Sequence, residues 1–84
     1  MKNEKIIVRP RFEESSNGII IRNDDIDRKI GAMIHKQTIK KFKLVRNEDY
    51  IIADKGIIFY NRSKYYNQIV SFLDTNNIYY SEVS

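Results

Sequence analysis

Residues 5–12 have the pattern of a β-strand with one apolar face, while the opposite face carries Lys5, Ile7, Arg9 and Arg11. The side chains of the apolar face are Ile6, Val8, Pro10 and Phe12. Pro10 has no backbone N–H to donate to a sheet, so we place this strand at a sheet edge. Residues 15–18 contain Asn-Gly and are predicted to form a turn. The apolar run at residues 19–21 predicts a short strand covered on both faces.

A helical period follows. Residues 23–25, Asn-Asp-Asp, are typical of a helix start, with a capping side chain and acids at the positive end of the dipole. The predicted buried stripe consists of Ile26, Ile30, Met33 and Ile34. We expect the helix to continue to about residue 44, which directs Ile39 and Phe42 away from the stripe. The alternative is a helix that ends near Gln37, with an extended segment over residues 39–45.

The second half of the chain predicts a hairpin, a helix and a strand. Apolar runs at residues 50–53 and 57–60 flank Asp-Lys-Gly, whose Gly56 suits the left-handed bulge position of a β-hairpin. Ser63 is predicted to cap a second helix. The apolar face of that helix contains Tyr66, Ile69, Val70 and Leu73, widened by Tyr65 and Phe72. Residues 75–77 are expected to end it, before a last strand at residues 78–83.

From Ile19 onward the predicted order is strand, helix, hairpin, helix, strand. This is the β-α-β-β-α-β order of small two-layer sandwiches of the ferredoxin-like type, here with an extra N-terminal edge strand. We therefore predict one α+β domain over residues 1–84. A longer meander is the alternative if residues 39–45 form a strand.

Residues 55–60, Lys-Gly-Ile-Ile-Phe-Tyr, are similar in part to the third-strand motif of RNA-recognition-motif proteins. Lys55, Gly56 and Phe59 match that motif, whereas Ile57 and Ile58 replace an aromatic and a small residue. The companion aromatic on the first strand is absent too. We therefore do not assign the chain to that family, and we expect Phe59 to lie in the core.

Composition limits what holds the domain together and where it acts. At 84 residues the chain is near the size at which a single core is only marginally stabilising. It has no cysteine, so packing alone must stabilise the fold. No signal-peptide-like or membrane-spanning apolar run is present in the sequence, and we expect a cytoplasmic protein with no membrane partner.

Charge is uneven along the chain. Residues 1–46 carry twelve bases and six acids, whereas residues 47–84 carry three bases and five acids. Residues 28–46 hold seven lysines and arginines and no acid, although a solvated helix usually alternates both signs. On a helix, Lys29, Lys36 and Lys40 would share a sector of about 60° with Lys43.

This pattern predicts a nucleic-acid partner, RNA or DNA, held mainly by phosphate contacts, because lysine offers a point charge without the fork that arginine uses to read guanine. The candidate contacts are Arg28, Lys29, Lys36, Lys40, Lys43, Arg46, Arg9 and Arg11. The plainer interpretation is a face that keeps a small protein soluble.

Other classes of function have less support. One histidine, His35, and no thiol give little basis for catalysis, and neither a metal nor a cofactor is expected. The alternative is a protein–protein modulator or inhibitor that binds an acidic surface, such as a phage or mobile-element (anti-defence) accessory protein. Its contact residues would be Phe42, Tyr79 and Tyr80. The last strand, if it is an edge, could pair with a second copy to form a homodimer.

Overall fold

The computed structural model describes residues 3–6 and 18–83 of the chain. The elements are β1 (Asn3–Ile6), β2 (Gly18–Arg22), the 3-10 turn η2 (Asn23–Asp25), α1 (Arg28–Ile34), the π-helix η3 (His35–Lys40), β3 (Tyr50–Ala53), β4 (Gly56–Tyr60), α2 (Tyr66–Thr75) and β5 (Tyr80–Val83). Most of the predicted first strand, with Arg9, Pro10 and Arg11, lies outside the described residues, as does most of the turn at residues 15–18.

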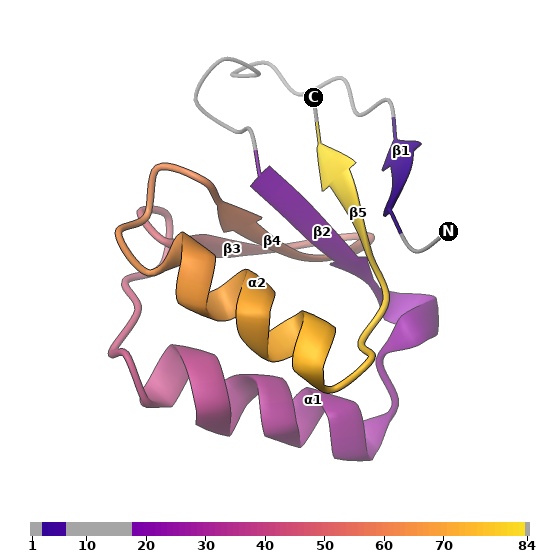
Figure 1. Ribbon diagram of the computed structural model, residues 1–84, viewed down its shortest axis with the longest axis horizontal. Helices are drawn as coiled ribbons and strands as arrows, with labels where there is room; N and C mark the ends of the chain where they lie inside the picture. Colours follow the sequence, from indigo (N-terminus) through magenta and orange to yellow (C-terminus); the bar gives the residue numbers. More distant parts are fainter. Residues whose placement is uncertain (1–2, 7–17, 84) are drawn as a thin grey trace.

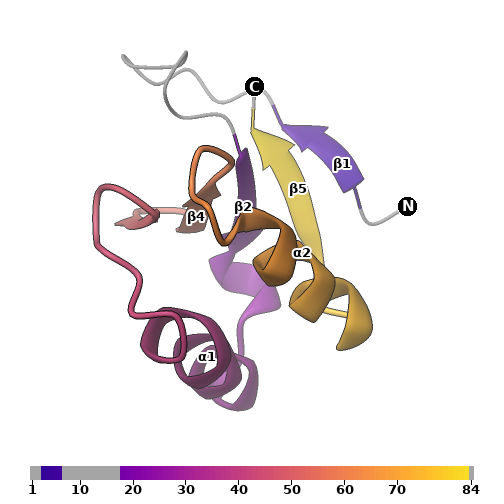
Figure 2. The same cartoon turned by 60° about the vertical axis from the view of Figure 1, so that its left-hand side comes forward.

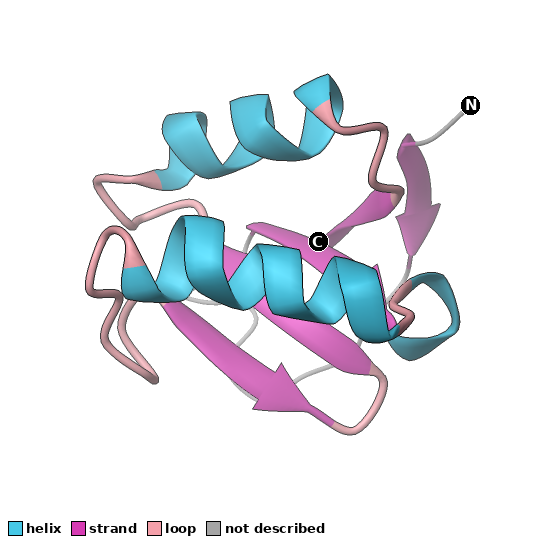
Figure 3. Cartoon of the chain, turned by 90° about the horizontal axis from the view of Figure 1, so that it is seen from below, coloured by secondary structure: helices cyan, strands magenta, loops and turns pink. Residues whose placement is uncertain are grey.

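The strands form one sheet in the order β1-β5-β2-β4-β3 (Figure 1). β2 pairs antiparallel with both β4 and β5, β3 pairs antiparallel with β4, and β1 runs parallel to β5 at the edge. Both helices cover the same face of this sheet, as Figures 2 and 3 show. The predicted α+β domain, with two helices and a four-stranded antiparallel sheet, is therefore confirmed.

The core lies between the sheet and the helices. Its buried residues are Ile19, Ile21, Ile34, Leu44, Phe59, Ile69, Leu73, Ile78 and Tyr80. Phe59 is fully buried, as expected, and so it is not a stacking platform for bases. The three isoleucines of β2 are all buried, which confirms the prediction of a strand covered on both faces.

Two glycines allow β2 and β4 to approach closely at both ends of their pairing. A Cβ on Gly56 would collide with the carbonyl oxygen of Ile21 and lie 2.8 Å from Cα of Arg22. A Cβ on Gly18 would collide with the carbonyl oxygen of Phe59. The hairpin is confirmed, with Gly56 opposite Ala53. Gly56 has φ 158°, so it does not adopt the left-handed bulge conformation that we predicted. Close backbone approach, rather than turn geometry, requires this glycine.

The first helix begins later than predicted. Asn23 belongs to η2, where its side-chain amide donates to the carbonyl of Asp54 at 2.7 Å. Because this side chain is held by the hairpin turn, it does not cap the helix. The cap is Asp27, whose carboxylate accepts a hydrogen bond from the N–H of Ile30 at 2.7 Å.

The helix does not break near Gln37; its last part is instead the π-helix η3. In an α-helix each four-residue step advances the side chain by about 40° beyond a full turn, so Phe42 would drift about 120° from Ile30. A π-helix spans one more residue per hydrogen bond and turns less per residue. Ile34 and Thr38 are therefore both fully buried, and Phe42 packs against the core. Our placement of Ile39 and Phe42 on the outer side was wrong, because it assumed α-helical geometry throughout.

Lys43 ends this helix in a left-handed conformation, with φ 55°. The N–H of Leu44 donates to the carbonyl of Ile39 at 2.9 Å. The N–H of Lys43 donates to the carbonyl of Lys40 at 3.3 Å. These two bonds form a Schellman motif, and the buried Leu44 supplies its apolar contact. Residues 39–45 are therefore not the extended segment of the alternative prediction.

The other boundaries differ by a few residues. Helix α2 ends as predicted at residues 75–77, with Asn77 left-handed at φ 57°. Its start is later, because the hydroxyl of Ser63 accepts from the N–H of Tyr65 at 3.2 Å in the preceding turn. Strand β5 lies between β1 and β2 and is not an edge strand, so the condition for its predicted pairing in a homodimer is not met.

Candidate nucleic-acid interface

The candidate interface is the solvent side of α1 and η3 with the turn that follows. We call it the basic face, and its residues are Arg28, Lys29, Lys36, Lys40, Lys41, Lys43 and Arg46. All seven side chains are exposed. Their exposure follows from the register, because Lys36 and Lys40 lie two residues after the buried Ile34 and Thr38. Two residues correspond to slightly more than half a turn, so these lysines point away from the core.

The basic face is broader than the single row expected from the sequence. Lys36 and Lys40 follow Arg28 at helical spacing, with exposed Ala32 between them. Lys29 lies on an adjacent row, together with Lys41. Lys43 lies beyond the helix in the left-handed turn.

Nothing in the described part of the chain neutralises the basic face. Within residues 18–83 its side chains form no salt bridge with an acid. The acid nearest in sequence on the N-terminal side, Asp27, is engaged as the helix cap. A face of unpaired cations produces a positive potential that attracts polyanions.

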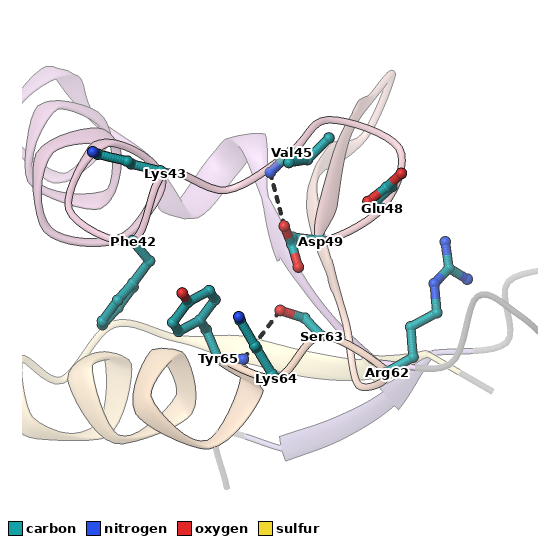
Figure 4. Close-up of a pocket in the computed structure, with 9 residues that line it drawn as sticks. All are labelled: Phe42, Lys43, Val45, Glu48, Asp49, Arg62, Ser63, Lys64 and Tyr65. Atoms are coloured by element: carbon teal, nitrogen blue, oxygen red, sulfur yellow. Dashed lines mark hydrogen bonds between the residues drawn. The ribbon is translucent and has the colours of Figure 1, made fainter.

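At the C-terminal end of the basic face lies a cavity of about 660 Å³, which we call the end cavity. Figure 4 shows Phe42, Lys43 and Val45 on one side of it and Arg62, Lys64 and Tyr65 on the other. Its two walls are the end of the first helix and the turn before α2, which the fold brings together. Of the basic residues predicted for the site, Lys43 alone lines this cavity in the described part of the chain.

A stacked pair of rings joins the two walls. The rings of Phe42 and Tyr65 are 4.8 Å apart between centroids and 19° from parallel. The ammonium of Lys41 lies 5.5 Å from the Phe42 centroid, and that of Lys64 lies 5.3 Å from the Tyr65 centroid. Cations at these distances from ring faces are weakly attracted to them.

Two acids also line the end cavity. Asp49 is held by the backbone, because its carboxylate accepts from the N–H of Val45 at 2.8 Å. Glu48 is exposed beside it. The cavity therefore has a mixed lining, with the cations Lys43, Arg62 and Lys64 and the acids Glu48 and Asp49.

Sequence reasoning missed Arg62, Lys64 and Tyr65 as neighbours of the basic face. Arg62 is already engaged, with its guanidinium 4.3 Å from the Tyr60 ring and a 3.1 Å hydrogen bond to the carbonyl of Asn47. These residues follow the hairpin, far along the chain from the basic run, and no local sequence pattern relates the two segments. Only the tertiary fold brings them together.

The predicted protein-contact residues are not a common surface. Phe42 is packed in the stack, and Tyr80 is buried with its hydroxyl donating to Asp74 at 2.9 Å. Tyr79 is half-buried. Arg9 and Arg11 lie outside the described residues.

A second cavity, of about 380 Å³, lies between α2 and β5 and has an acidic rim with Asp74 and Glu82. Burial, followed by the hydrogen bond to Asp74 and nearby charges, raises the pKa of Tyr80 from 10.0 to about 12. Burial and the charge of Glu82 also raise the pKa of Tyr66. Both tyrosines therefore stay protonated, and this cavity has the opposite charge character to the basic face.

No family model, curated protein or solved structure matches this chain. In the described part of the chain, no three histidine, aspartate or glutamate side chains are grouped to hold a metal ion. None of its helices combines the length and the apolar character needed to cross a membrane.

Proposed function

We propose that this protein is a small, cytoplasmic, non-enzymatic domain that binds nucleic acid through the basic face, mainly by contacts with phosphates. The observation that carries the proposal is the exposure of six cations on the helical segment and its C-terminal turn, and of Arg46 shortly after it, in a stretch that contains no acid. Lysine predominates among them, which favours backbone contacts over the reading of base edges. Affinity should therefore depend strongly on salt and weakly on sequence.

We also propose a ferredoxin-like arrangement for the part that follows β1. Its support is the strand order β5-β2-β4-β3, in which all neighbours are antiparallel, with both helices on one face. In this arrangement the basic face is on the outer side of the helical layer. Phe59 is buried in the core, so it does not offer a ring for base stacking on the sheet.

The test is a titration of labelled single-stranded RNA, single-stranded DNA and duplex DNA at several salt concentrations. Four or five phosphate contacts predict a slope of about −3 to −4.5 for log affinity against log salt. Absence of any complex at low salt would remove the proposal.

A double charge-reversal variant tests whether nucleic acid binds at the basic face. Lys36→Glu with Lys40→Glu should leave the fold intact and weaken binding by at least about tenfold at low salt. The matched control is Arg22→Glu with Lys55→Glu, which makes the same charge change at exposed positions by the hairpin turn. Equal weakening by both pairs would show a response to net charge rather than to the basic face.

A protein–protein modulator is the second candidate, because two large apolar side chains are exposed. Val45 is 50% exposed and Ile52, on the edge strand β3, is 46% exposed. Pull-down from a lysate before and after nuclease treatment separates the two candidates. Partners lost with nuclease favour nucleic acid, and partners retained favour the modulator.

A further inference from the structure

We propose that the end cavity takes an unpaired base, so that the preferred ligand of the basic face is a single-stranded nucleic acid. This inference rests on the proposed function and specifies the class of ligand. Its basis is the meeting, at one end of the basic face, of a cavity, a stacked aromatic pair and cations from two separate segments. Single-strand binding sites commonly combine such aromatic side chains with a positively charged track.

The cavity is large enough to admit a base, and two aromatic rings line it. Its volume of about 660 Å³ lies within the range typical of small-ligand sites. Phe42 and Tyr65 are half-buried and line it, so their rings are held by the fold while part of each remains accessible. A base that contacts these rings would meet a rigid apolar surface rather than a mobile side chain.

The cations around the rings suit the sugar–phosphate backbone. Lys64 rests over Tyr65 at 5.3 Å and Lys41 rests over Phe42 at 5.5 Å, and neither forms a salt bridge within residues 18–83. Each ammonium is on a flexible stem, so it can move from a ring to a phosphate when a base arrives. Lys43 continues the same track onto the helix.

The lysines define the expected path of the strand, which would pass along Lys43 and Lys64 and continue towards Lys40. Glu48 and Asp49 share their part of the cavity lining with Arg62, so the acids alone do not set this path. A duplex cannot use this cavity without unstacking a base, which costs free energy that a single strand largely avoids.

The first experiment compares three ligands on the unmodified protein by fluorescence anisotropy. They are a short single strand, a duplex of equal length, and a strand of the same length and charge whose central nucleotides are abasic. Stacking of one base predicts binding of the intact strand about five- to 150-fold tighter than that of the abasic strand. Equal affinity for the intact and abasic strands would overturn the inference but not the proposed function.

The second experiment replaces Tyr65 and uses its neighbour as control. Tyr65→Leu should weaken binding of the intact strand about five- to 150-fold while leaving the abasic strand and the duplex unchanged. Tyr66→Leu makes the same change one residue later, at the second cavity, and should leave all three affinities unchanged. Thermal unfolding checks that both variants fold, and the ligand comparison above stands even if Tyr65→Leu does not.

The outcomes separate the two levels of the proposal. A Tyr65-dependent preference for intact single strands, lost with Lys36→Glu and Lys40→Glu, supports both. Binding of all three ligands alike, sensitive to the two lysines and insensitive to Tyr65, overturns the base site and retains the phosphate-binding face. No complex with any ligand overturns both.

Discussion

The hydroxyl of Thr38 donates a hydrogen bond to the carbonyl of Ile34, one turn earlier in the same helix. Both residues are fully buried. This bond lies within the change from α-helix to π-helix, where the backbone hydrogen-bonding pattern shifts. The buried hydroxyl of Thr38 thus adds a hydrogen bond within the helix on which most of the basic face lies.

Thr38→Val keeps the shape of this side chain and removes its donor. We expect the free energy of unfolding to fall by about 1–2 kcal/mol, because a buried carbonyl loses a partner. Thr75→Val, the same change at the exposed end of α2, should alter it by less than about 0.5 kcal/mol. Urea unfolding measures both. Equal effects at the two positions would show that the Thr38 hydroxyl contributes nothing specific.

Lys43→Gly should affect stability and binding in opposite directions. A non-glycine residue at φ 55° is strained, so glycine should raise the free energy of unfolding by about 0.5–1 kcal/mol. The same variant removes a cation from the end cavity and should weaken nucleic-acid binding. Lys41→Gly is the control, because Lys41 has φ −62° and glycine there should destabilise by about 0.5–1 kcal/mol. Destabilisation by Lys43→Gly would contradict the assigned turn.

The glycines of the chain should respond differently to alanine. Gly56→Ala introduces a Cβ against the backbone of β2 and should lower the free energy of unfolding by at least about 2 kcal/mol. Gly31→Ala, within α1, meets only the Cγ2 methyl of Ile26 at 3.3 Å. That methyl must give by a few tenths of an ångström, which offsets part of the higher helix propensity of alanine, so we expect a change within about 1 kcal/mol of zero. Thermal and urea unfolding of the two variants would test the contrast, and similar losses at both positions would refute it.

Two buried serines allow a paired test of hydrogen bonding. The hydroxyl of Ser81 is buried and has no hydrogen-bond partner among the described residues. Ser81→Ala should therefore raise the free energy of unfolding by up to about 1 kcal/mol. Ser63→Ala removes the acceptor of the Tyr65 N–H and should lower it by about 0.5–1.5 kcal/mol. A loss at Ser81 equal to that at Ser63 would mean that the Ser81 hydroxyl is bonded in solution.

Alkaline pH should destabilise the fold through Tyr80. Its pKa is about 12 in the fold against 10.0 as the ordinary value, so the folded state favours the protonated hydroxyl. The resulting stabilisation is fully present below pH 10 and is lost as pH rises towards 12. Tyr80→Phe should flatten this loss, whereas Tyr50→Phe should retain it. Urea unfolding at a series of pH values provides the measurement, and an unchanged alkaline slope in Tyr80→Phe would contradict the assignment.

The short apolar strands were the most predictable elements. The hairpin and the strand at residues 19–21 follow from local apolar runs and a glycine turn, and the structure places them as expected. The register of the first helix was not predictable, because a period of 3.6 residues was assumed for Ile39 and Phe42. In the π-helix and the turn after it, Thr38 is buried and the half-buried Phe42 packs against the core, a tertiary effect that a local pattern does not contain.

The candidate site also has a part that the sequence could predict and a part that it could not. Exposure of the lysines could be predicted, because a charged side chain with no acidic partner nearby in the sequence is rarely buried. The end cavity could not, since it needs Tyr65 and Lys64 to lie beside Phe42. Asp27 was also missed as the helix cap, although its position three residues before Ile30, whose N–H donates to its carboxylate, is a usual capping spacing.

Strand β2 is bordered by β4 and β5 and has its isoleucines buried on both faces. Its amide protons are therefore expected to exchange with solvent water only when the whole molecule opens. The basic helix can fray at its solvent side without exposing them. An isotope label on Ile20 would thus report global opening, while a label on Lys40 would report local motion, and ligand binding could be followed separately at each.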